Sequence, residues 1–270
     1  MPVPPESLDR LPAAAARAVH GVLTDIDDTL TTAGAITADA LQALAALRGA
    51  GLRVVAVTGR PMGWSEPIAC DAPLDAVVAE NGGVALFRDA AAGALQVEYA
   101  QGEAERAVNA RRLRAAAERV LREVPGATLA RDSTGRRTDI AIDHAEFAAL
   151  APERIADVVR VMRDAGLNAT VSSIHVNGWI GGHDKLSGAR WIVRRLWGED
   201  LDAERGRWVY VGDSTNDEAM FAHFPLSVGV ANLLDFAGRL RVWPAYLAHS
   251  ARGAGFAEVA QRLLEAREAA

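Results

Sequence analysis

The sequence predicts an α/β protein whose core is a doubly wound parallel sheet, interrupted by an inserted α+β unit. Two observations predict the core. Short apolar runs stop at polar residues, and helical patterns or Gly- and Pro-marked turns separate one run from the next. A third observation predicts the insertion, because strands in the middle of the chain alternate with polar residues, as in a sheet with one wet face.

The expected first core segment contains three apolar strands and one helix. Residues 21–24 form a short apolar run that ends at acidic residues, which is typical of a buried parallel strand. A helix follows with Thr37 as its N-cap, and two glycines end it near residue 51. Residues 52–57, rich in β-branched side chains, and residues 76–79 are the next two strands.

The middle of the chain has a different pattern. Residues 103–124 are helical, with apolar residues on one side and many arginines on the other. Two strands, over 137–143 and 168–176, flank a second helix over 151–165. These elements predict a separate α+β unit between two parts of the core.

The doubly wound pattern resumes after this unit. A helix begins near Lys185, residues 208–211 and 226–230 are strands, and residues 256–264 form a closing helix. We therefore divide the chain into a first core segment, an inserted domain and a second core segment, at residues 1–86, 87–180 and 181–270.

The composition narrows the possible functions. The 270 residues include one cysteine, Cys70, so we expect neither an intramolecular disulfide nor a thiolate zinc site. The net charge of −6 argues against a nucleic-acid partner. Glutamates interleave the one arginine cluster, which we interpret as a solvated helix face: Arg106, Arg111, Arg112 and Arg114. No apolar run approaches the roughly 18 residues of a membrane span, and no secretory signal is recognisable, so we expect a cytoplasmic protein without a membrane partner.

Reactive side chains follow the predicted core strands at the points where those strands end. In chain order they are an acid pair, a hydroxyl, a cation and a second acid pair: Asp25 and Asp27, Thr58, Lys185, Asp213 and Asp217. Taken singly, each is more typical of a turn, a helix cap or a solvated side chain. Ligands of open α/β sheets bind beyond the carboxyl ends of the strands, so the joint arrangement predicts an active site.

The four segments resemble the four motifs of the haloacid dehalogenase (HAD) superfamily. The matching residues are Asp25-Ile26-Asp27-Asp28-Thr29, Thr58-Gly59-Arg60, Lys185, and Gly212-Asp213-Ser214-Thr215-Asn216-Asp217. The large insertion before the third motif is similar to the type IIB branch, which includes Cof-like hydrolases and sucrose-phosphate and mannosyl-3-phosphoglycerate phosphatases. This resemblance implies a Rossmann-like core with a C2B-type cap. The third motif departs from the family pattern, because the common glycine does not follow Lys185 directly.

The resemblance implies a Mg²⁺-dependent phosphatase that acts through an aspartyl-phosphate. Asp25 is then the nucleophile, and Asp27 is the acid that protonates the leaving alcohol and later the base that activates water. Mg²⁺ prefers oxygen ligands, and the implied ligands are Asp25, the carbonyl oxygen of Asp27, Asp213 and Asp217. The implied phosphate-binding residues are Thr58, Gly59, Arg60, Lys185 and Asn216.

The expected reaction is hydrolysis of a phosphomonoester, with a sugar phosphate or a similar small phosphorylated metabolite as substrate. By the resemblance, superfamily dehalogenases lack the second acid, so Asp27 favours phosphoryl chemistry. A phosphomutase or phosphotransferase uses the same two acids, and the sequence leaves that alternative open. A signalling receiver module is disfavoured because its phosphorylated aspartate follows the third strand, where this chain has Glu80. The intact acids also disfavour a catalytically inactive binding protein.

A cap of this kind covers the active site and contacts the leaving group. The candidates in the insertion are Arg131, Arg136, Arg137, Ser172, Ser173, His175 and Asn177. Solvated positions are more common for the arginines, whereas we expect one or two of the other four residues to contact the substrate. For Arg60, contact with substrate or cap and a structural salt bridge are equally expected.

Overall fold

The core of the molecule is a nine-stranded sheet. The computed structural model describes residues 4–88 and 93–268. From edge to edge the strands are β1 (Glu6–Ser7), β15 (Tyr246–Leu247), β14 (Leu226–Gly229), β13 (Trp208–Gly212), β2 (Gly21–Thr24), β5 (Arg53–Val57), β6 (Ala76–Ala79), β7 (Val84–Arg88) and β8 (Leu95–Tyr99). Neighbours are parallel from β1 to β6, and β7 and β8 add an antiparallel edge. The predicted fold class is confirmed.

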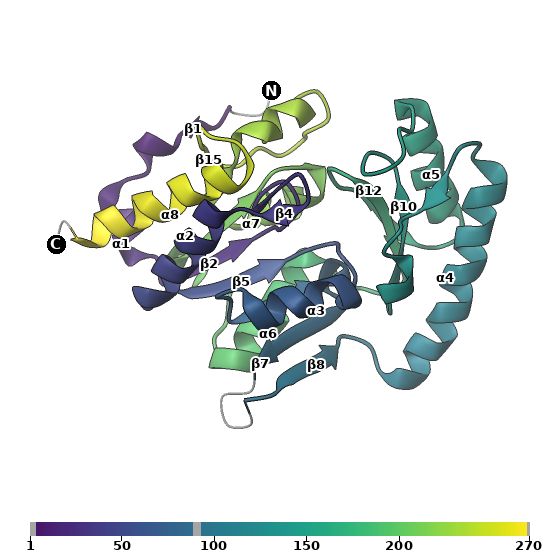
Figure 1. The fold of residues 1–270 in the computed structure, drawn as a ribbon, viewed down its shortest axis with the longest axis horizontal. Coiled ribbons are helices and arrows are strands. Elements are labelled where there is room, and N and C mark those ends of the chain that lie inside the picture. Colours follow the sequence, from purple (N-terminus) through teal and green to yellow (C-terminus); the bar gives the residue numbers. More distant parts are fainter. Residues whose placement is uncertain (1–3, 89–92, 269–270) are drawn as a thin grey trace.

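Helices cover both faces of this sheet (Figure 1). On one face lie α1 (Ala13–Ala18), α2 (Ala38–Gly49), α3 (Met62–Asp71) and α8 (Arg252–Glu268), and on the other lie α6 (Lys185–Trp197) and α7 (Glu218–His223). Successive strand residues point to opposite faces, so Val22 packs with the first group and Leu23 with the second. Because both faces are covered, the central strands are apolar over most of their length, with Thr24 and Arg53 at strand ends as exceptions.

The start of α6 positions one of the predicted site residues. The Asp184 carboxylate accepts a hydrogen bond from the Ser187 amide at 2.7 Å, and the Asp184 amide donates to the Ser187 hydroxyl at 2.8 Å. This reciprocal pair is a capping box, which fixes the residue where the helix starts. Lys185 is therefore held at the first position of α6.

Several short elements were not expected from the sequence. They are α1, α3, α7, the two outermost strands at each side of the large sheet (β1 and β15, β7 and β8), β9 (Thr128–Leu129), and a hairpin of β3 (Thr31–Thr32) and β4 (Ala35–Ile36). Short elements give weak periodicity, and in α3 the pattern is interrupted by Pro67. Tertiary packing therefore determines them more than local sequence does.

The inserted segment forms a second, smaller sheet with two helices, on the right in Figure 1. This antiparallel sheet has the order β11 (Asn168–Val171), β12 (His175–Trp179), β10 (Asp139–Asp143) and β9 (Thr128–Leu129). The helices α4 (Glu103–Glu123) and α5 (Pro152–Asp164) share with it an apolar core of its own. The α+β character predicted for the insertion is present.

The strand expected over residues 168–176 is in fact two strands, so that prediction was wrong. β11 and β12 pair antiparallel, and Ser172 closes the turn between them. Its amide donates to the His175 carbonyl at 2.9 Å, and its hydroxyl accepts from the His175 amide at 3.0 Å. This turn contains neither glycine nor proline, and its two serines, Ser172 and Ser173, are a weaker turn signal.

The limits of the three segments stay predictions. β8 pairs with β7, which places residues 95–99 in the nine-stranded sheet. We therefore propose that the insertion begins after Tyr99.

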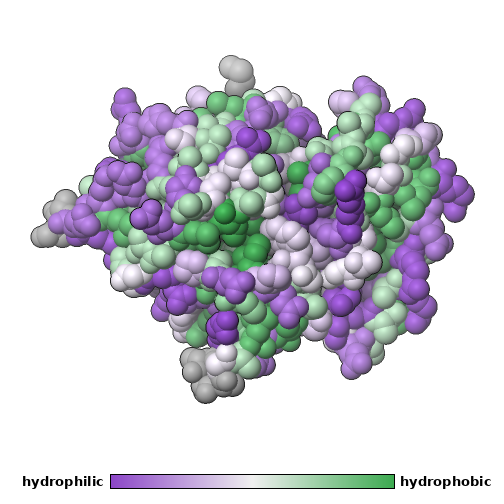
Figure 2. Space-filling model, in the orientation of Figure 1, coloured by the Kyte–Doolittle hydropathy of each residue, from purple (hydrophilic) through white to green (hydrophobic). Residues whose placement is uncertain are grey.

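The outer side of α4 is hydrophilic, at the right-hand edge of Figure 2. Arg111, Arg112 and Arg114 are exposed there, whereas the Arg106 guanidinium lies 3.7 Å from the ring centre of Tyr99. This arrangement agrees with the solvated helix face expected for most of the cluster. Across residues 4–88 and 93–268, none of the helices combines the length and the apolar character needed to span a bilayer.

Candidate active site

The carboxyl ends of three neighbouring strands bring the predicted residues together. In the sheet order β13-β2-β5, Asp213 follows the first strand, Asp25 the second and Thr58 the third. The Asp25 amide continues the ladder by donating to the Val211 carbonyl at 2.9 Å. Residues that are more than 180 positions apart in the sequence thus lie at one edge of the sheet.

Three buried carboxylates form the centre of this site. One oxygen from each of Asp25, Asp213 and Asp217 lies within 4.8 Å of the others. Asp217 accepts hydrogen bonds from the amides of Asp213 and Ser214, at 3.0 and 3.1 Å, and from the Tyr210 hydroxyl. The loop after β13 is therefore folded around Asp217.

Lys185 reaches the same cluster from the start of α6. Its ammonium donates to Asp25 at 2.8 Å and to Asp217 at 2.7 Å, and only 3% of the residue is exposed. Burial disfavours the ammonium, but the two carboxylates outweigh this effect and raise the pKa of Lys185. The lysine is therefore a fixed positive charge beside Asp25.

One cation does not balance three buried carboxylates. Burial raises the pKa of Asp25 to about 7 and raises that of Asp213 well above its usual range. Asp213 accepts from the Asn232 amide at 3.2 Å through one oxygen, whereas its buried Oδ1 has no hydrogen-bond partner among the described residues. An all-oxygen cluster with an unpaired carboxylate oxygen fits a hard divalent cation such as Mg²⁺.

Asp27 lies apart from these three carboxylates and contacts Arg60. Both of its oxygens accept from the Arg60 Nε, at 3.0 and 2.9 Å. Burial raises the pKa of Asp27, and Arg60 opposes this rise. The structure therefore places a second acid next to the carboxylate cluster, on the side of the loop that follows β5.

The Thr58-Gly59 turn is tightly enclosed. The Thr58 hydroxyl is buried and accepts from the Arg60 amide at 3.0 Å. The Gly59 carbonyl accepts from Arg136 at 3.0 Å and from Asn177 at 3.2 Å, both of which come from the insertion. A Cβ atom at position 59 would lie 3.2 Å from the Asn177 side-chain oxygen and 3.3 Å from the Asn81 side chain, so a larger residue would displace these two side chains.

Arg60 makes salt bridges on both sides of the interface. Besides Asp27, it contacts Asp132 at 3.2 Å and Glu146 at 2.8 Å, which belong to the inserted segment. Arg60 therefore contacts the cap and also forms buried salt bridges, so both of the roles expected for it apply. Its assignment as a phosphate ligand stays a prediction.

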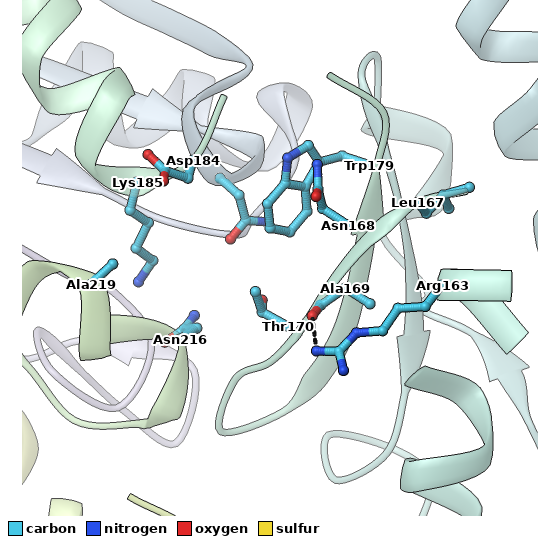
Figure 3. A pocket seen from close by; sticks show the side chains of 11 residues that line it. Arg163, Leu167, Asn168, Ala169, Thr170, Trp179, Asp184, Lys185, Asn216 and Ala219 are labelled. Atoms are coloured by element: carbon cyan, nitrogen blue, oxygen red, sulfur yellow. Dashed lines mark hydrogen bonds between the residues drawn. The ribbon is translucent and has the colours of Figure 1, made fainter. Parts of the chain in front are cut away.

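A cavity of about 450 Å³ opens beside Lys185 (Figure 3). Asn216 and Lys185 lie on its core side, and Thr170 and Trp179 lie on the side of the insertion. Asn216 accepts from the Ser214 hydroxyl at 2.8 Å, so it orders its own loop. The hydrogen bonds of Lys185 within the described residues go to Asp25 and Asp217 instead. Two lining atoms are buried without a partner among the described residues, the Asn81 amide nitrogen and the Thr170 hydroxyl.

The insertion residues named from the sequence have unequal roles. Arg136 and Asn177 bind the Gly59 carbonyl, and His175 contacts Glu146 at 2.9 Å. Ser172 closes a turn, and the Arg131 guanidinium lies 3.8 Å from the Phe147 ring centre. Sequence reasoning missed Thr170, Trp179 and Glu146. For these, the sequence offered no signal beyond their place in the insertion.

Comparison with known proteins agrees with this geometry. Residues 22–108 match the family model for haloacid dehalogenase-like hydrolases. No curated protein matches the chain by sequence.

Solved structures match over nearly the whole chain. A Thermoplasma acidophilum protein is 16% identical with a TM-score of 0.68, and the match covers 91% of this chain and 98% of that one. A putative HAD/Cof-like hydrolase from Plasmodium vivax is 17% identical with a TM-score of 0.66, covering 94% and 98%. The sucrose-phosphatase of Synechocystis is 16% identical with a TM-score of 0.64, covering 92% and 98%. These identities show a shared fold, including the inserted unit. Residues 22–108 are thus similar to haloacid dehalogenase-like hydrolases, and the chain shares the fold of the matched structures.

Proposed function

We propose that this protein is a Mg²⁺-dependent phosphomonoesterase that acts through an aspartyl-phosphate. The observation that carries the proposal is the contact of Lys185 with Asp25 inside a cluster of three buried carboxylates. A phosphate monoester is a dianion, so an attacking carboxylate needs positive charge beside it. Lys185 supplies one such charge, and the cluster is suited to hold a second.

Four residues would hold the Mg²⁺ ion. Asp25 and Asp213 offer carboxylate oxygens, Asp27 its carbonyl oxygen, and Asp217 supports the ion from the loop after β13. The bound ion would neutralise charge on the phosphate. The unpaired oxygen of Asp213 supports this ligand set, because a buried carboxylate oxygen without a donor is costly.

The protein side chains would carry out the two chemical steps. A carboxylate oxygen of Asp25 attacks phosphorus, the bond from phosphorus to the leaving oxygen breaks, and Asp27 gives that oxygen its proton. In the second step Asp27 takes a proton from water, which attacks the aspartyl-phosphate and releases inorganic phosphate. Thr58, the Gly59 amide, Arg60, Lys185 and Asn216 are the proposed phosphate-binding groups.

We propose a sugar phosphate or a similar small phosphorylated metabolite as the substrate. The cavity beside Lys185 is large enough for a small polar leaving group. Two structures of similar fold, a sucrose-phosphatase and a HAD subclass IIB sugar phosphatase, support this substrate class.

A screen for phosphate release tests the proposal. Wild-type protein and Asp25→Asn are assayed with a panel of sugar and other metabolite phosphates, each with Mg²⁺ and with EDTA. We expect Mg²⁺-dependent release by the wild type and a loss of at least about 1,000-fold in Asp25→Asn, which lacks the nucleophile. Equal release by both proteins would contradict it. Added alcohols as acceptors distinguish hydrolysis from phosphoryl transfer.

A further inference from the structure

The guanidinium of Arg60 joins the core to the inserted segment. On the core side it binds both oxygens of Asp27. On the other side Glu146 accepts from Nη2 at 2.8 Å and from Nη1 at 3.3 Å, and Asp132 accepts from Nη1 at 3.2 Å. The ring of Trp64 lies 4.6 Å away. Since Arg60 is only 4% exposed, these neighbours determine where its guanidinium sits.

Glu146 is itself held in place on two sides. The Asp143 carboxylate, at the end of β10, accepts from the amides of Ala145, Glu146 and Phe147 at 3.1, 2.9 and 2.9 Å. These bonds fix the backbone that carries Glu146. The His175 ring on β12 contacts its Oε2 at 2.9 Å. Glu146 is therefore an ordered carboxylate presented by the small sheet, and its geometry is set before any ligand binds.

Arg60 does not need Glu146 for charge balance. Asp27 and Asp132 remain as partners when Glu146 is neutralised, so its loss leaves no unpaired buried cation. What Glu146 adds is geometric, because it holds the end of the guanidinium opposite to Asp27. A neutral substitution is therefore expected to loosen this contact without unfolding the protein.

We propose that Glu146 is a positioning residue that acts through Arg60 to place the acid Asp27. The inference rests on the proposed function, in which Asp27 protonates the leaving alcohol. Proton transfer requires the acid within hydrogen-bond reach of that oxygen. The contact between the insertion and the core thus determines the position of Asp27, and the insertion also covers the site.

The test compares two substrates in single-turnover reactions of Glu146→Gln. With a sugar phosphate identified by the screen, we expect release of the alcohol to slow by about 10- to 100-fold, the cost of a misplaced acid. With 4-nitrophenyl phosphate, whose leaving group needs no proton, we expect less than about a threefold change. A loss caused only by a displaced contact of Arg60 with phosphate would affect both substrates alike, so the difference between the two substrates assigns the effect to the position of Asp27.

Two further variants control this experiment. Glu146→Asp keeps the charge and should restore part of the lost rate on the sugar phosphate. Glu118→Gln is the same chemical change on the exposed face of α4 and should behave as wild type. Equal losses on both substrates, or no loss on either, would overturn the inference and leave Glu146 as a structural ion pair.

A second measurement decides the inference if the wild type proves inactive in the screen, which would refute the proposed function alone. The Arg60 Nε–H donates to Asp27, so its hydrogen exchange, followed by NMR, reports that contact directly. We expect faster exchange in Glu146→Gln than in wild type and in Glu118→Gln. An unchanged rate would show that Glu146 does not position Arg60 against Asp27.

Discussion

At the scale of single residues, the site is dominated by carboxylates that have been removed from water. Asp213 illustrates the consequence, because one oxygen accepts from Asn232 while the other has no partner among the described residues. Burial raises its pKa, which means that the charged form is unfavourable without a cation. The buried Asp213 carboxylate therefore costs stability, and the Mg²⁺ ion of the proposed function would offset this cost.

Asp213→Asn should act in opposite directions on the metal-free and the metal-loaded protein. Without Mg²⁺ we expect the free energy of unfolding to rise by about 1–3 kcal/mol, because a buried unpaired carboxylate is removed. The stabilisation by added Mg²⁺ should disappear. Thermal unfolding with EDTA and with Mg²⁺ measures both effects, and Asp235→Asn on an exposed site is the control. A full Mg²⁺-induced rise in Tm in Asp213→Asn would contradict the ligand assignment.

His175 gives the protein a defined sensitivity to acid. Burial lowers its folded-state pKa to about 4, below the ordinary value near 6.5. Between these values the unfolded chain binds the proton and the folded protein does not, so stability falls as the pH falls from about 6.5 to about 4. The shift corresponds to about 3 kcal/mol.

Urea unfolding of His175→Gln at several pH values checks this slope. We expect the variant to lose less stability than wild type between pH 6.5 and 4, because glutamine does not titrate. Parallel curves for the two proteins would show that other groups cause the acid sensitivity.

At the scale of elements, helix starts and strand ends place the reactive groups. The capping box of α6 fixes Lys185, and the end of β13 fixes the loop of Asp213 and Asp217. Gly212 ends that strand, and a side chain there would come within 2.5 Å of the Asp217 carboxylate. Position 212 therefore requires glycine, because the Asp217 carboxylate packs against the end of β13.

Removal of the α6 cap should lower stability by a measurable amount. Asp184→Ala loses the side-chain bond to the Ser187 amide, and we expect the free energy of unfolding to fall by about 1 kcal/mol. Thr37→Ala is a matched control, because Thr37 precedes α2 without a side-chain capping bond, and its effect should be smaller. Urea unfolding compares the two variants. A larger loss for Thr37→Ala would contradict the role given to the cap.

At the scale of the whole molecule, buried polar contacts clamp the insertion onto the core. Glu80 follows β6 and accepts from the Met62 amide of the core at 3.0 Å. It also accepts from the amides of Arg137 and Thr138 and from the Thr138 hydroxyl, at 3.0, 2.5 and 2.6 Å. The fully buried Glu80 carboxylate thus accepts hydrogen bonds from both the core and the insertion.

Glu80→Gln should weaken this clamp. The glutamine amide brings donors to a position that is surrounded by donors, so we expect a loss of about 2–5 kcal/mol in the free energy of unfolding. Glu66→Gln, on the exposed side of α3, should change it by less than about 0.5 kcal/mol. Urea unfolding measures both, and equal stability of the two variants would contradict the clamp.

The sequence by itself determined the core strands and the acids at their ends. Residues 21–24 and 208–211 are short apolar runs that end in Asp25 and Asp213, and parallel pairing brings such ends to one edge. Those signals are local. A strand that is buried on both faces appears in the sequence as a continuous apolar run, and the polar residues that follow the run mark where the strand ends. The fold class and the family resemblance followed from them and are confirmed.

Only the tertiary structure decided how the insertion meets this edge. Arg60 pairs with Glu146, and Asn177 binds the Gly59 carbonyl, across 86 and 118 positions of the chain. Such pairs leave no periodic pattern, because they depend on the orientation of two packed units and on the conformation of single side chains. The same reason applies to the cavity beside Lys185, whose lining residues come from both the core and the insertion. The sequence thus determined the chemistry of the site, and the packing of the two units decided its surroundings.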